Sequence, residues 1–387
     1  MKKLTLCITI MLIFSLVLPV VTNFETASAS EINLSSENCV LMEFETGKVL
    51  FEKNADKRGQ IASMTKIMLL NLIFDKLESG EISKEDMVSV SERAMSMGGS
   101  QVFLDVKNKY AVNDLVKSII VASANDSSVA MAEYLFGSVE SAVTAMNDMA
   151  ETLGMQNTNF VNVTGLPHDD AYSTARDVAI MTRQLVGREM YKNYSKIWMD
   201  KIPHGEDNYT EISNTNKLLK RYAGCDGGKT GFTNQAMHCI SATAQKNDMR
   251  LIATVMHGSS SNERFQDAIT MFDYGFGGFE RKEVVSDKTP LEITAKVING
   301  KAESVGIVPS ESFSIISKKG GTAEYILNTI IKEDIKAPVK AGDEIGILEV
   351  VCDGEVVKTI ALIASEDVER AGIKDHLKNL FPNKGDF

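Results

Sequence analysis

Three short motifs in the sequence could together transfer an acyl group. The first, Ser63-Met64-Thr65-Lys66, places a hydroxyl and an amine three residues apart at the start of a run with helical periodicity. Residues three apart on a helix share a face, so the spacing predicts a nucleophile beside its base. A serine hydroxyl attacks only after a base takes its proton, and burial and cationic neighbours can lower a lysine pKa enough for that task. Backbone N–H groups at the helix start would face the developing oxyanion.

The second motif, Ser123-Ala124-Asn125, precedes another helical pattern, and two interpretations stay open. Ser123, Asn125 or Asp126 could cap the helix, because short polar side chains favour that position. Alternatively, the Ser123 hydroxyl relays a proton toward a leaving amine, while Asn125 binds a substrate amide and helps to hold Lys66.

The third motif, Lys229-Thr230-Gly231, lies in a strand pattern. The positive charge of Lys229 would attract a carboxylate and would lower the pKa of Lys66. Thr230 offers a hydroxyl to the same carboxylate, and Gly231 leaves the strand edge open for a peptide-like substrate. The run 223–230 also approaches a nucleotide-binding P-loop. That motif needs glycine where Ala223 stands and a helix after the threonine, whereas 231–244 reads as turn and strand, so nucleotide binding is disfavoured.

Histidines and cysteines show no metal-ligand spacing, so we expect neither a metal nor another cofactor. Four cysteines follow residue 29, at positions too far apart for a disulfide framework: Cys39, Cys225, Cys239 and Cys352. We expect buried thiols. A bridge between Cys225 and Cys239, which flank one expected hairpin, is the alternative, although their register is not expected to be directly opposite.

Taken in this order, with 60 and 106 residues between their first members, the three motifs resemble those of the serine D-Ala-D-Ala carboxypeptidases, the low-molecular-mass penicillin-binding proteins. Surrounding segments resemble the family from about residue 43 to 274. They are Ala62-Ser63-Met64-Thr65-Lys66, Gly98-Gly99-Ser100-Gln101, 122–126, Leu153-Gly154-Met155, Gly165-Leu166-Pro167, Tyr172-Ser173-Thr174-Ala175 and Asn214-Thr215-Asn216-Lys217-Leu218-Leu219.

The resemblance implies catalytic roles for four of these residues. Ser63 would be acylated and Lys66 would act as its base, while Ser123 and Asn125 would complete the proton relay. The fold implied is a β-lactamase/transpeptidase-like domain, an antiparallel sheet with flanking helices, followed by a small all-β domain.

The resemblance also implies a substrate site. Lys229 and Thr230 would grip the terminal carboxylate, with Gly231 beside them, and the Phe232 backbone N–H would complete the oxyanion hole. Arg264, in a helix after the last strand, is similar to a family arginine that supports carboxylate recognition. A surface salt bridge is the alternative for that arginine.

Two positions depart from the family pattern. Ala171 stands where relatives often carry histidine, and Met237-His238 replaces a commoner pair of small residues. These changes would alter substrate preference or rate without touching the proposed nucleophile, base or carboxylate site.

The activity implied is removal of the terminal D-alanine from peptidoglycan stem pentapeptides, with β-lactam antibiotics as covalent inhibitors. A β-lactamase is one alternative, but a deacylating glutamate is expected there, and Glu189-x-x-x-Asn193 lies too late in the sequence. A non-catalytic wall-binding or penicillin-sensing protein is another, and the intact Ser63, Lys66 and Lys229 argue against it.

The chain begins as a secretory signal does. Lys2 and Lys3 precede an apolar run from Leu4 to about Val21, and Ala27-Ser28-Ala29 offers a small-residue cleavage site. We expect cleavage after Ala29 and an exported, extracytoplasmic protein of the cell envelope. A retained membrane anchor is the alternative.

Removal of residues 1–29, with two lysines and one glutamate, takes the formal charge from −11 to −12, which argues against nucleic acid as a partner. The remaining 358 residues, in a chain that is 44% hydrophobic, suffice for two packed domains.

The periodicity predicts an α+β catalytic domain over 30–283. A hairpin at 39–51 and strands at 227–232, 237–244 and 250–257 enclose a mainly helical stretch from 91 to 185, so we expect the first hairpin to join the later strands. A helix is expected at 264–274. Short alternating runs beyond residue 283 predict the all-β C-terminal domain over 284–365.

The last segment, 366–387, has apolar residues at helix-like spacing: Val368, Ile373, Leu377, Leu380 and Phe381. Basic residues between them suggest an amphipathic foot that contacts a membrane peripherally. Acidic residues in the same segment weaken that idea, and a terminal helix packed on the β-rich domain is the alternative.

Overall fold

The computed structural model describes residues 32–206, 208–321, 324–352 and 354–372. The expected signal at 1–29 and most of the last segment, 373–387, lie outside the described residues. Within the described ranges, no helix combines the length and the apolar composition needed to cross a membrane.

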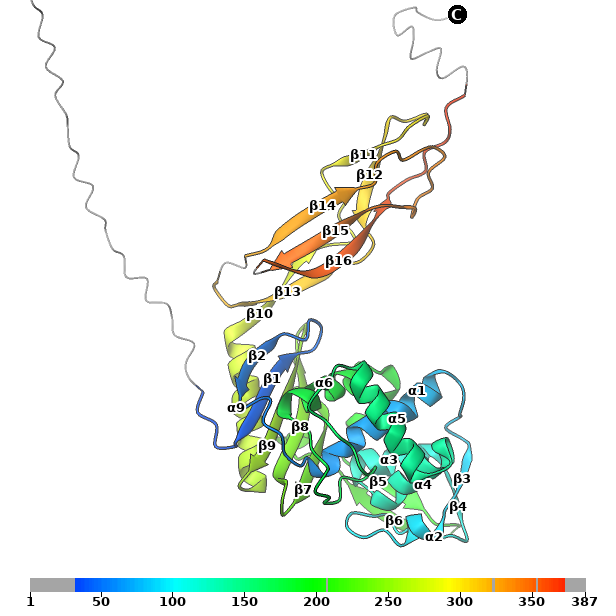
Figure 1. Ribbon diagram of the computed structural model, residues 1–387, viewed down its shortest axis with the longest axis vertical. Helices are drawn as coiled ribbons and strands as arrows, with labels where there is room; N and C mark the ends of the chain where they lie inside the picture. Colours follow the sequence, from blue (N-terminus) through cyan, green and yellow to red (C-terminus); the bar gives the residue numbers. More distant parts are fainter. Residues whose placement is uncertain (1–31, 207, 322–323, 353, 373–387) are drawn as a thin grey trace, which may run out of the picture. The chain divides into compact units, whose positions relative to one another are not determined.

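An antiparallel sheet of five strands supports the site, in the order β2-β1-β9-β8-β7. Its strands are β1 (Asn38–Glu43), β2 (Val49–Lys53), β7 (Cys225–Thr233), β8 (Met237–Lys246) and β9 (Met249–Gly258). Val40 of β1 lies opposite Thr254 of β9, so the first hairpin joins strands from much later in the chain. The predicted α+β layer is confirmed, and β7 forms an edge of the sheet (Figure 1).

Helices cover both faces of this sheet. They are the 3₁₀ turn η1 (Ala62–Thr65), α1 (Lys66–Glu78), α2 (Glu92–Met95), α3 (Val112–Val121), α4 (Asn125–Phe136), α5 (Val139–Thr152), α6 (Ala175–Val186), α7 (Glu189–Ser195), α8 (Leu218–Arg221) and α9 (Ser261–Gly278). In Figure 1, α1 to α6 gather on one side of the sheet, whereas α9 packs against β8 and β9 from the other.

Helix α1 runs through the centre of the helical layer. Every residue from Lys66 to Phe74 is buried, and all but two of these nine are apolar. A helix that is apolar all round has no solvent face, so it packs inside a domain rather than on its surface. The sequence therefore places Lys66 at the buried start of the central helix.

The stretch from 91 to 185 is less helical than predicted. Strand β4 (Lys109–Ala111) pairs with β3 (Met87–Ser89), and residues 153–174 form an irregular loop held by bridges from Ser173 to Gly59 and from Tyr172 to Asn159. A second small hairpin, β5 (Met199–Pro203) with β6 (Tyr209–Ser213), follows α7. Gly154, at φ +74°, adopts a left-handed conformation just after the end of α5, and Gly165, at φ +81°, adopts one within the loop.

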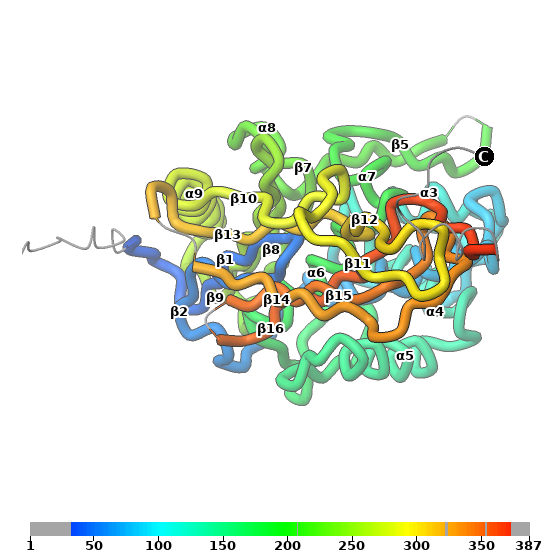
Figure 2. Tube along the Cα trace, turned by 90° about the horizontal axis from the view of Figure 1, so that it is seen from above, coloured from blue at the N-terminus to red at the C-terminus, as the bar shows by residue number. Residues whose placement is uncertain are grey.

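The C-terminal residues form strands only, in the described part of the chain. They are β10 (Phe279–Val285), β11 (Thr294–Lys296), β12 (Ser304–Pro309), β13 (Phe313–Lys318), β14 (Ile326–Ile331), β15 (Glu344–Cys352) and β16 (Glu355–Ala364). One sheet has the order β11-β12-β16-β15-β14, and β10 pairs with β13. Figure 2 shows β14, β15 and β16 side by side. The predicted all-β domain is confirmed.

Two predicted details can be compared with this domain. The boundary proposed near residue 283 falls inside β10, which pairs with β13. The start of the last segment is extended rather than helical: Val368 bridges Val339 and Arg370 bridges Gly300. These bridges satisfy backbone groups that a helix would satisfy internally.

The cysteines near the sheet are thiols. Across β7 and β8, Cys225 lies opposite Ala244 and Cys239 lies opposite Gly231, so the two sulfurs do not face each other. Burial raises the pKa of Cys225 to about 12 and that of Cys239 to about 11, which makes both poor nucleophiles. The alternative of a disulfide between them is wrong.

Candidate active site

Ser63 lies in the turn η1, and the buried Lys66 opens α1 directly after it. The Lys66 Nζ atom lies 3.1 Å from Ser63 Oγ, 2.7 Å from Asn125 Oδ1 and 2.6 Å from the Thr164 carbonyl oxygen. The expected juxtaposition of hydroxyl and amine is present, although Ser63 precedes the α-helix instead of beginning it.

The surroundings of Lys66 favour its neutral form. Burial lowers its pKa well below the ordinary value, and the positive charge of Lys229 lowers the pKa further, against the opposing charge of Asp126. Oδ1 of Asn125 and the Thr164 carbonyl can only accept hydrogen bonds. A neutral Lys66 amine can donate its two N–H groups to these two oxygens. Its lone pair then faces the Ser63 hydroxyl, from which it can accept the proton.

Lys229 and Ser123 form a second contact in the same place. The Lys229 Nζ atom donates to Ser123 Oγ at 2.7 Å and to the Thr230 carbonyl at 3.1 Å. Burial, followed by the charge of Arg264, lowers the pKa of Lys229 to about 7. Ser123 is held at φ +64°, a conformation that non-glycine residues adopt only when their surroundings impose it.

Capping does not explain the second motif. The N-cap of α4 is Ala124, and no side chain caps it, because the Ser123 hydroxyl faces Lys229 and Asn125 is already the first helical residue. The capping interpretation of Ser123 and Asn125 is therefore wrong.

The start of α4 also holds the loop that precedes α3. Asn125 donates from Nδ2 to the Gly98 carbonyl at 2.7 Å and from its backbone N–H to the Ser100 carbonyl. The fully buried Asp126 carboxylate accepts from the backbone N–H groups of Val102 and Leu104. Sequence analysis missed this role of Asp126, which only its position directly after the second motif could have suggested.

A second hydroxyl lies beside Thr230. Thr230 Oγ1 donates to Thr215 Oγ1 at 2.8 Å, and the Thr215 backbone N–H donates to the Val121 carbonyl, just before Ser123. Thr215 thus connects the second and third motifs. It belongs to the Asn214-Thr215-Asn216 segment quoted above, which gave no reason to single it out.

Gly231 lies close to the turn that carries Ser63, a contact that the sequence analysis did not predict. A Cβ atom there would lie 2.7 Å from the Ile61 carbonyl oxygen and 3.1 Å from the Ser63 backbone nitrogen. Strand β7 therefore packs closely against the turn η1, and the absence of a side chain on Gly231 permits that approach. The neighbouring Phe232 is 55% exposed, and its ring stacks on His238 with centroids 4.4 Å apart.

Arg264 is a buried residue of α9. Its Nη1 donates to the carbonyls of Gly231 at 2.9 Å and Cys239 at 3.1 Å, and burial lowers its pKa to about 10. The alternative of a surface salt bridge is wrong. Through these bonds the guanidinium fixes β7 at Gly231 and places a positive charge behind Lys229.

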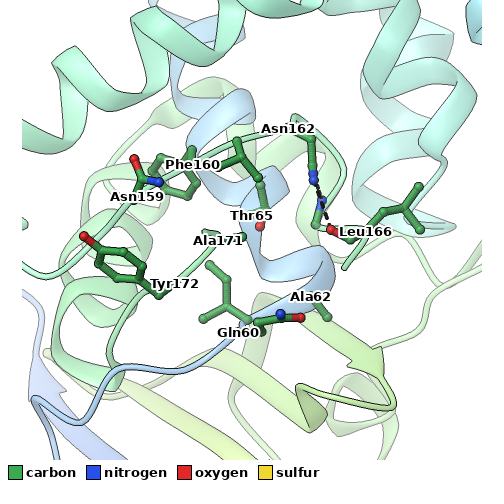
Figure 3. A pocket seen from close by; sticks show the side chains of 12 residues that line it. Gln60, Ala62, Thr65, Asn159, Phe160, Asn162, Leu166, Ala171 and Tyr172 are labelled. Atoms are coloured by element: carbon green, nitrogen blue, oxygen red, sulfur yellow. Dashed lines mark hydrogen bonds between the residues drawn. The ribbon is translucent and has the colours of Figure 1, made fainter. Parts of the chain in front are cut away.

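The loop 153–174 packs against the turn η1, which carries Ser63. A Cβ atom on Gly165 would lie 1.9 Å from the Ala62 carbonyl oxygen, and Asn162 Oδ1 accepts from the Gly165 N–H. Figure 3 shows the small pocket between turn and loop, with Thr65 on one side and Tyr172 on the other. This packing sets the Thr164 carbonyl against Lys66, a contact that the sequence analysis missed.

Two alternatives find no support in the geometry. Glu189, at the start of α7, has a side chain that is 83% exposed and pairs with Lys192, so it is not the deacylating glutamate of a β-lactamase. Beyond Thr230 the chain continues as strand to Thr233 and returns in β8, where a P-loop would begin a helix.

Most of the chain matches known families and a known protein. Residues 24–260 match the family described as D-alanyl-D-alanine carboxypeptidase, and residues 279–370 match the one described as penicillin-binding protein 5, C-terminal domain. D-alanyl-D-alanine carboxypeptidase DacF of Bacillus subtilis (strain 168) is 40% identical over 350 residues, 90% of this chain and 90% of that protein.

Solved structures show the same similarity. Penicillin binding protein 5 from Haemophilus influenzae aligns with a TM-score of 0.73 and 29% identity over 88% of this chain and 99% of that chain. Penicillin-binding protein D2 from Listeria monocytogenes, in its ampicillin-bound form, aligns with a TM-score of 0.57 and 28% identity over 63% of this chain and 99% of that chain.

Proposed function

We propose, from the premise that this chain belongs to the D-alanyl-D-alanine carboxypeptidase family, that it removes the terminal D-alanine from peptidoglycan stem pentapeptides through an acyl-enzyme on Ser63. The observation that carries the assignment of Ser63 is the buried Lys66 amine, which lies 3.1 Å from the Ser63 hydroxyl between two oxygen acceptors. Such an amine can take the hydroxyl proton at neutral pH.

Acylation proceeds by proton transfer and attack. Lys66 takes the Ser63 proton as Oγ attacks the carbonyl carbon of the penultimate D-alanine. The backbone N–H groups of Ser63 and Phe232 stabilise the oxyanion, and the approach of β7 to the Ser63 nitrogen supports that pairing.

The leaving amine then needs a proton. Lys66 returns the proton by way of the Ser123 hydroxyl, and the C–N bond breaks to release D-alanine. Asn125 holds Lys66 in place and binds a substrate amide. A water molecule then attacks the ester as Lys66 takes its proton. That proton passes to Ser63 Oγ as the bond between Oγ and the acyl group breaks, which restores Ser63 and leaves a shortened peptide with a free carboxylate.

The terminal carboxylate binds at the edge of β7. Protonated Lys229 supplies the charge, and Thr230 turns its hydroxyl from Thr215 to the carboxylate. The Thr215 hydroxyl can then donate to Thr230 Oγ1 and hold it in that orientation. Arg264 acts through the backbone of β7 rather than by touching the substrate, and Gly231 lets the strand lie against the nucleophile. A β-lactam offers a carboxylate and a strained amide to the same groups, so it acylates Ser63.

The test uses the protein without residues 1–29 and a diacyl peptide that ends in D-Ala-D-Ala. We expect released D-alanine from the wild type and none from Ser63→Ala, whose fold is checked by circular dichroism. Nitrocefin distinguishes the alternatives: slow, near-stoichiometric trapping agrees with a carboxypeptidase, whereas rapid repeated turnover would indicate a β-lactamase.

The place of action is part of the proposal. The enzyme is exported by its N-terminal segment, and its C-terminal segment contacts the outer face of the cytoplasmic membrane. Sedimentation with anionic and neutral vesicles, for the chain with and without residues 373–387, tests the second statement. Equal binding by both forms would assign any contact to other residues.

A further inference from the structure

Strand β14 is an unprotected edge of the C-terminal sheet. Among the described residues it pairs with β15 alone, and its sequence, Ile-Leu-Asn-Thr-Ile-Ile, contains neither charge nor proline. Ile326 is 62% exposed and Ile330 50% exposed, and even Leu327, on the side of the domain core, is 39% exposed. Edge strands of soluble proteins usually carry charges, prolines or bulges that prevent further pairing. None of these devices is present in β14.

The free edge presents a defined set of backbone groups. The Lys332 N–H donates to the Ile345 carbonyl at 2.9 Å, and the β14–β15 register continues from Ile326 to Ile331 without a shift. Because backbone groups alternate in direction along a strand, the even-numbered residues bond with β15. Leu327, Thr329 and Ile331 therefore direct their N–H and C=O groups away from the sheet, where another strand can bind.

We propose that β14 pairs antiparallel with β14 of a second copy of this chain, with the two-fold axis at Asn328. In this register, Leu327 exchanges backbone hydrogen bonds with Thr329 of the second copy, and Ile326 lies opposite its Ile330 on the outward face. The two Asn328 side chains meet at the axis. The two sheets then continue into one, and each Ile326 side chain packs beside Ile330 of the other copy.

Charge complementarity identifies the partner as a second copy. The same register, continued two residues before β14, places Glu324 opposite Lys332 of the second copy, and symmetry repeats the pair at the other end. There Glu324 joins the ion pair that Lys332 makes with Glu344 of its own chain at 2.8 Å. Opposite charges directly across two strands stabilise their pairing, and the uncharged residues between them raise no repulsion. A strand edge that is complementary to itself about a two-fold axis favours a closed, isologous dimer over an open-ended polymer.

A cross-linking experiment tests the register in the full chain lacking residues 1–29. At a two-fold axis between strands, opposite Cα atoms lie within the range that a disulfide spans. Asn328→Cys should therefore form a disulfide-linked dimer under mild oxidation. Thr359→Cys, exposed on the interior strand β16, and the wild type should remain uncross-linked. Equal cross-linking of the two cysteine variants would overturn the proposed axis.

A charge at the axis tests the dimer itself. Asn328→Lys sets two like charges against each other and should weaken dimerisation about tenfold or more in sedimentation equilibrium. Thr359→Lys adds the same charge to the same domain and should leave dimerisation unchanged. A wild type that is monomeric at every concentration would overturn the proposal, and so would a monomer that binds lipid vesicles through β14. D-alanine release by Asn328→Lys checks that the fold is intact.

Discussion

At the scale of single residues, the site depends on two lysines whose pKa values are lowered for different tasks. Burial and Lys229 lower the pKa of Lys66, as its proposed role as a base requires, and the pKa of Lys229 falls to about 7. Lys66 must be neutral to accept a proton, whereas Lys229 must be protonated to attract a carboxylate. Their opposite requirements restrict activity to a range of pH.

The pH dependence follows from these directions. The neutral fraction of Lys66 grows as pH rises through its lowered pKa, which gives kcat/KM an ascending limb. The protonated fraction of Lys229 falls as pH rises through about 7, which gives a descending limb. Replacing Lys229 with arginine should lower kcat/KM and remove the descending limb, because arginine keeps its proton. A descending limb unchanged in Lys229→Arg would assign it to another group.

Asp126 provides a finer test. Its charge raises the pKa of Lys66, so Asp126→Asn should move the ascending limb to lower pH, while the amide oxygen keeps accepting from Val102 and Leu104. Asp177→Asn is the matched control, because that buried carboxylate also holds a loop but is not among the causes of the Lys66 shift. An equal displacement in both variants would contradict the account.

At the scale of secondary-structure elements, Gly231 of β7 and Gly165 of the loop 153–174 allow both segments to pack against the turn that carries Ser63. Gly231→Ala brings a methyl group to 2.7 Å from the Ile61 carbonyl oxygen and should displace Ser63 from the oxyanion hole. We expect penicillin acylation to slow by up to about a hundredfold, with a stability loss of about 1–3 kcal/mol. Gly277→Ala, in open space on α9, is the control. Equal acylation rates would show that the close approach is not needed.

The elements themselves were largely predictable from the sequence. Alternation located β1, β2 and β7 to β9. Helical periodicity located the stretch from 91 to 185 that contains α3 to α5, and the expected helix at 264–274 lies within α9. The loop 153–174 was not predictable, because no local pattern holds it: Ser173 forms a bridge with the distant Gly59, and Tyr172 forms one with Asn159 across the loop. Thr164 and Thr215 were missed for the same reason. Each reaches the site through contacts with residues far away in the sequence, which spacing does not encode.

The contacts of the motif residues differ in how far the sequence could predict them. Ser63 and Lys66 are close in sequence, so helical geometry alone predicts their contact. The contact between Ser123 and Lys229 spans 106 residues. The resemblance to a family placed both residues in one site, but it did not predict that they touch. The close approach of Gly231 to Ile61 and Ser63 was not predicted, because η1 lies far from Gly231 in the sequence.

At the scale of the whole molecule, the N-terminal segment should be absent from the working enzyme. Cleavage after Ala29 leaves Ser30 at the new N-terminus, and the intact mass of exported protein from a secreting host measures this directly. Replacing Ala27 and Ala29 with bulky residues should block processing. A mature protein that keeps residues 1–29 would instead support the membrane-anchor alternative.

The central claim is that Ser63 forms the acyl-enzyme, and the mass of the protein after incubation with benzylpenicillin tests it most directly. The account predicts one penicilloyl group per chain, located by peptide mapping to the fragment that contains Ser63, and none on folded Ser63→Ala. A folded wild type that gains no adduct, or gains one on another residue, would contradict it.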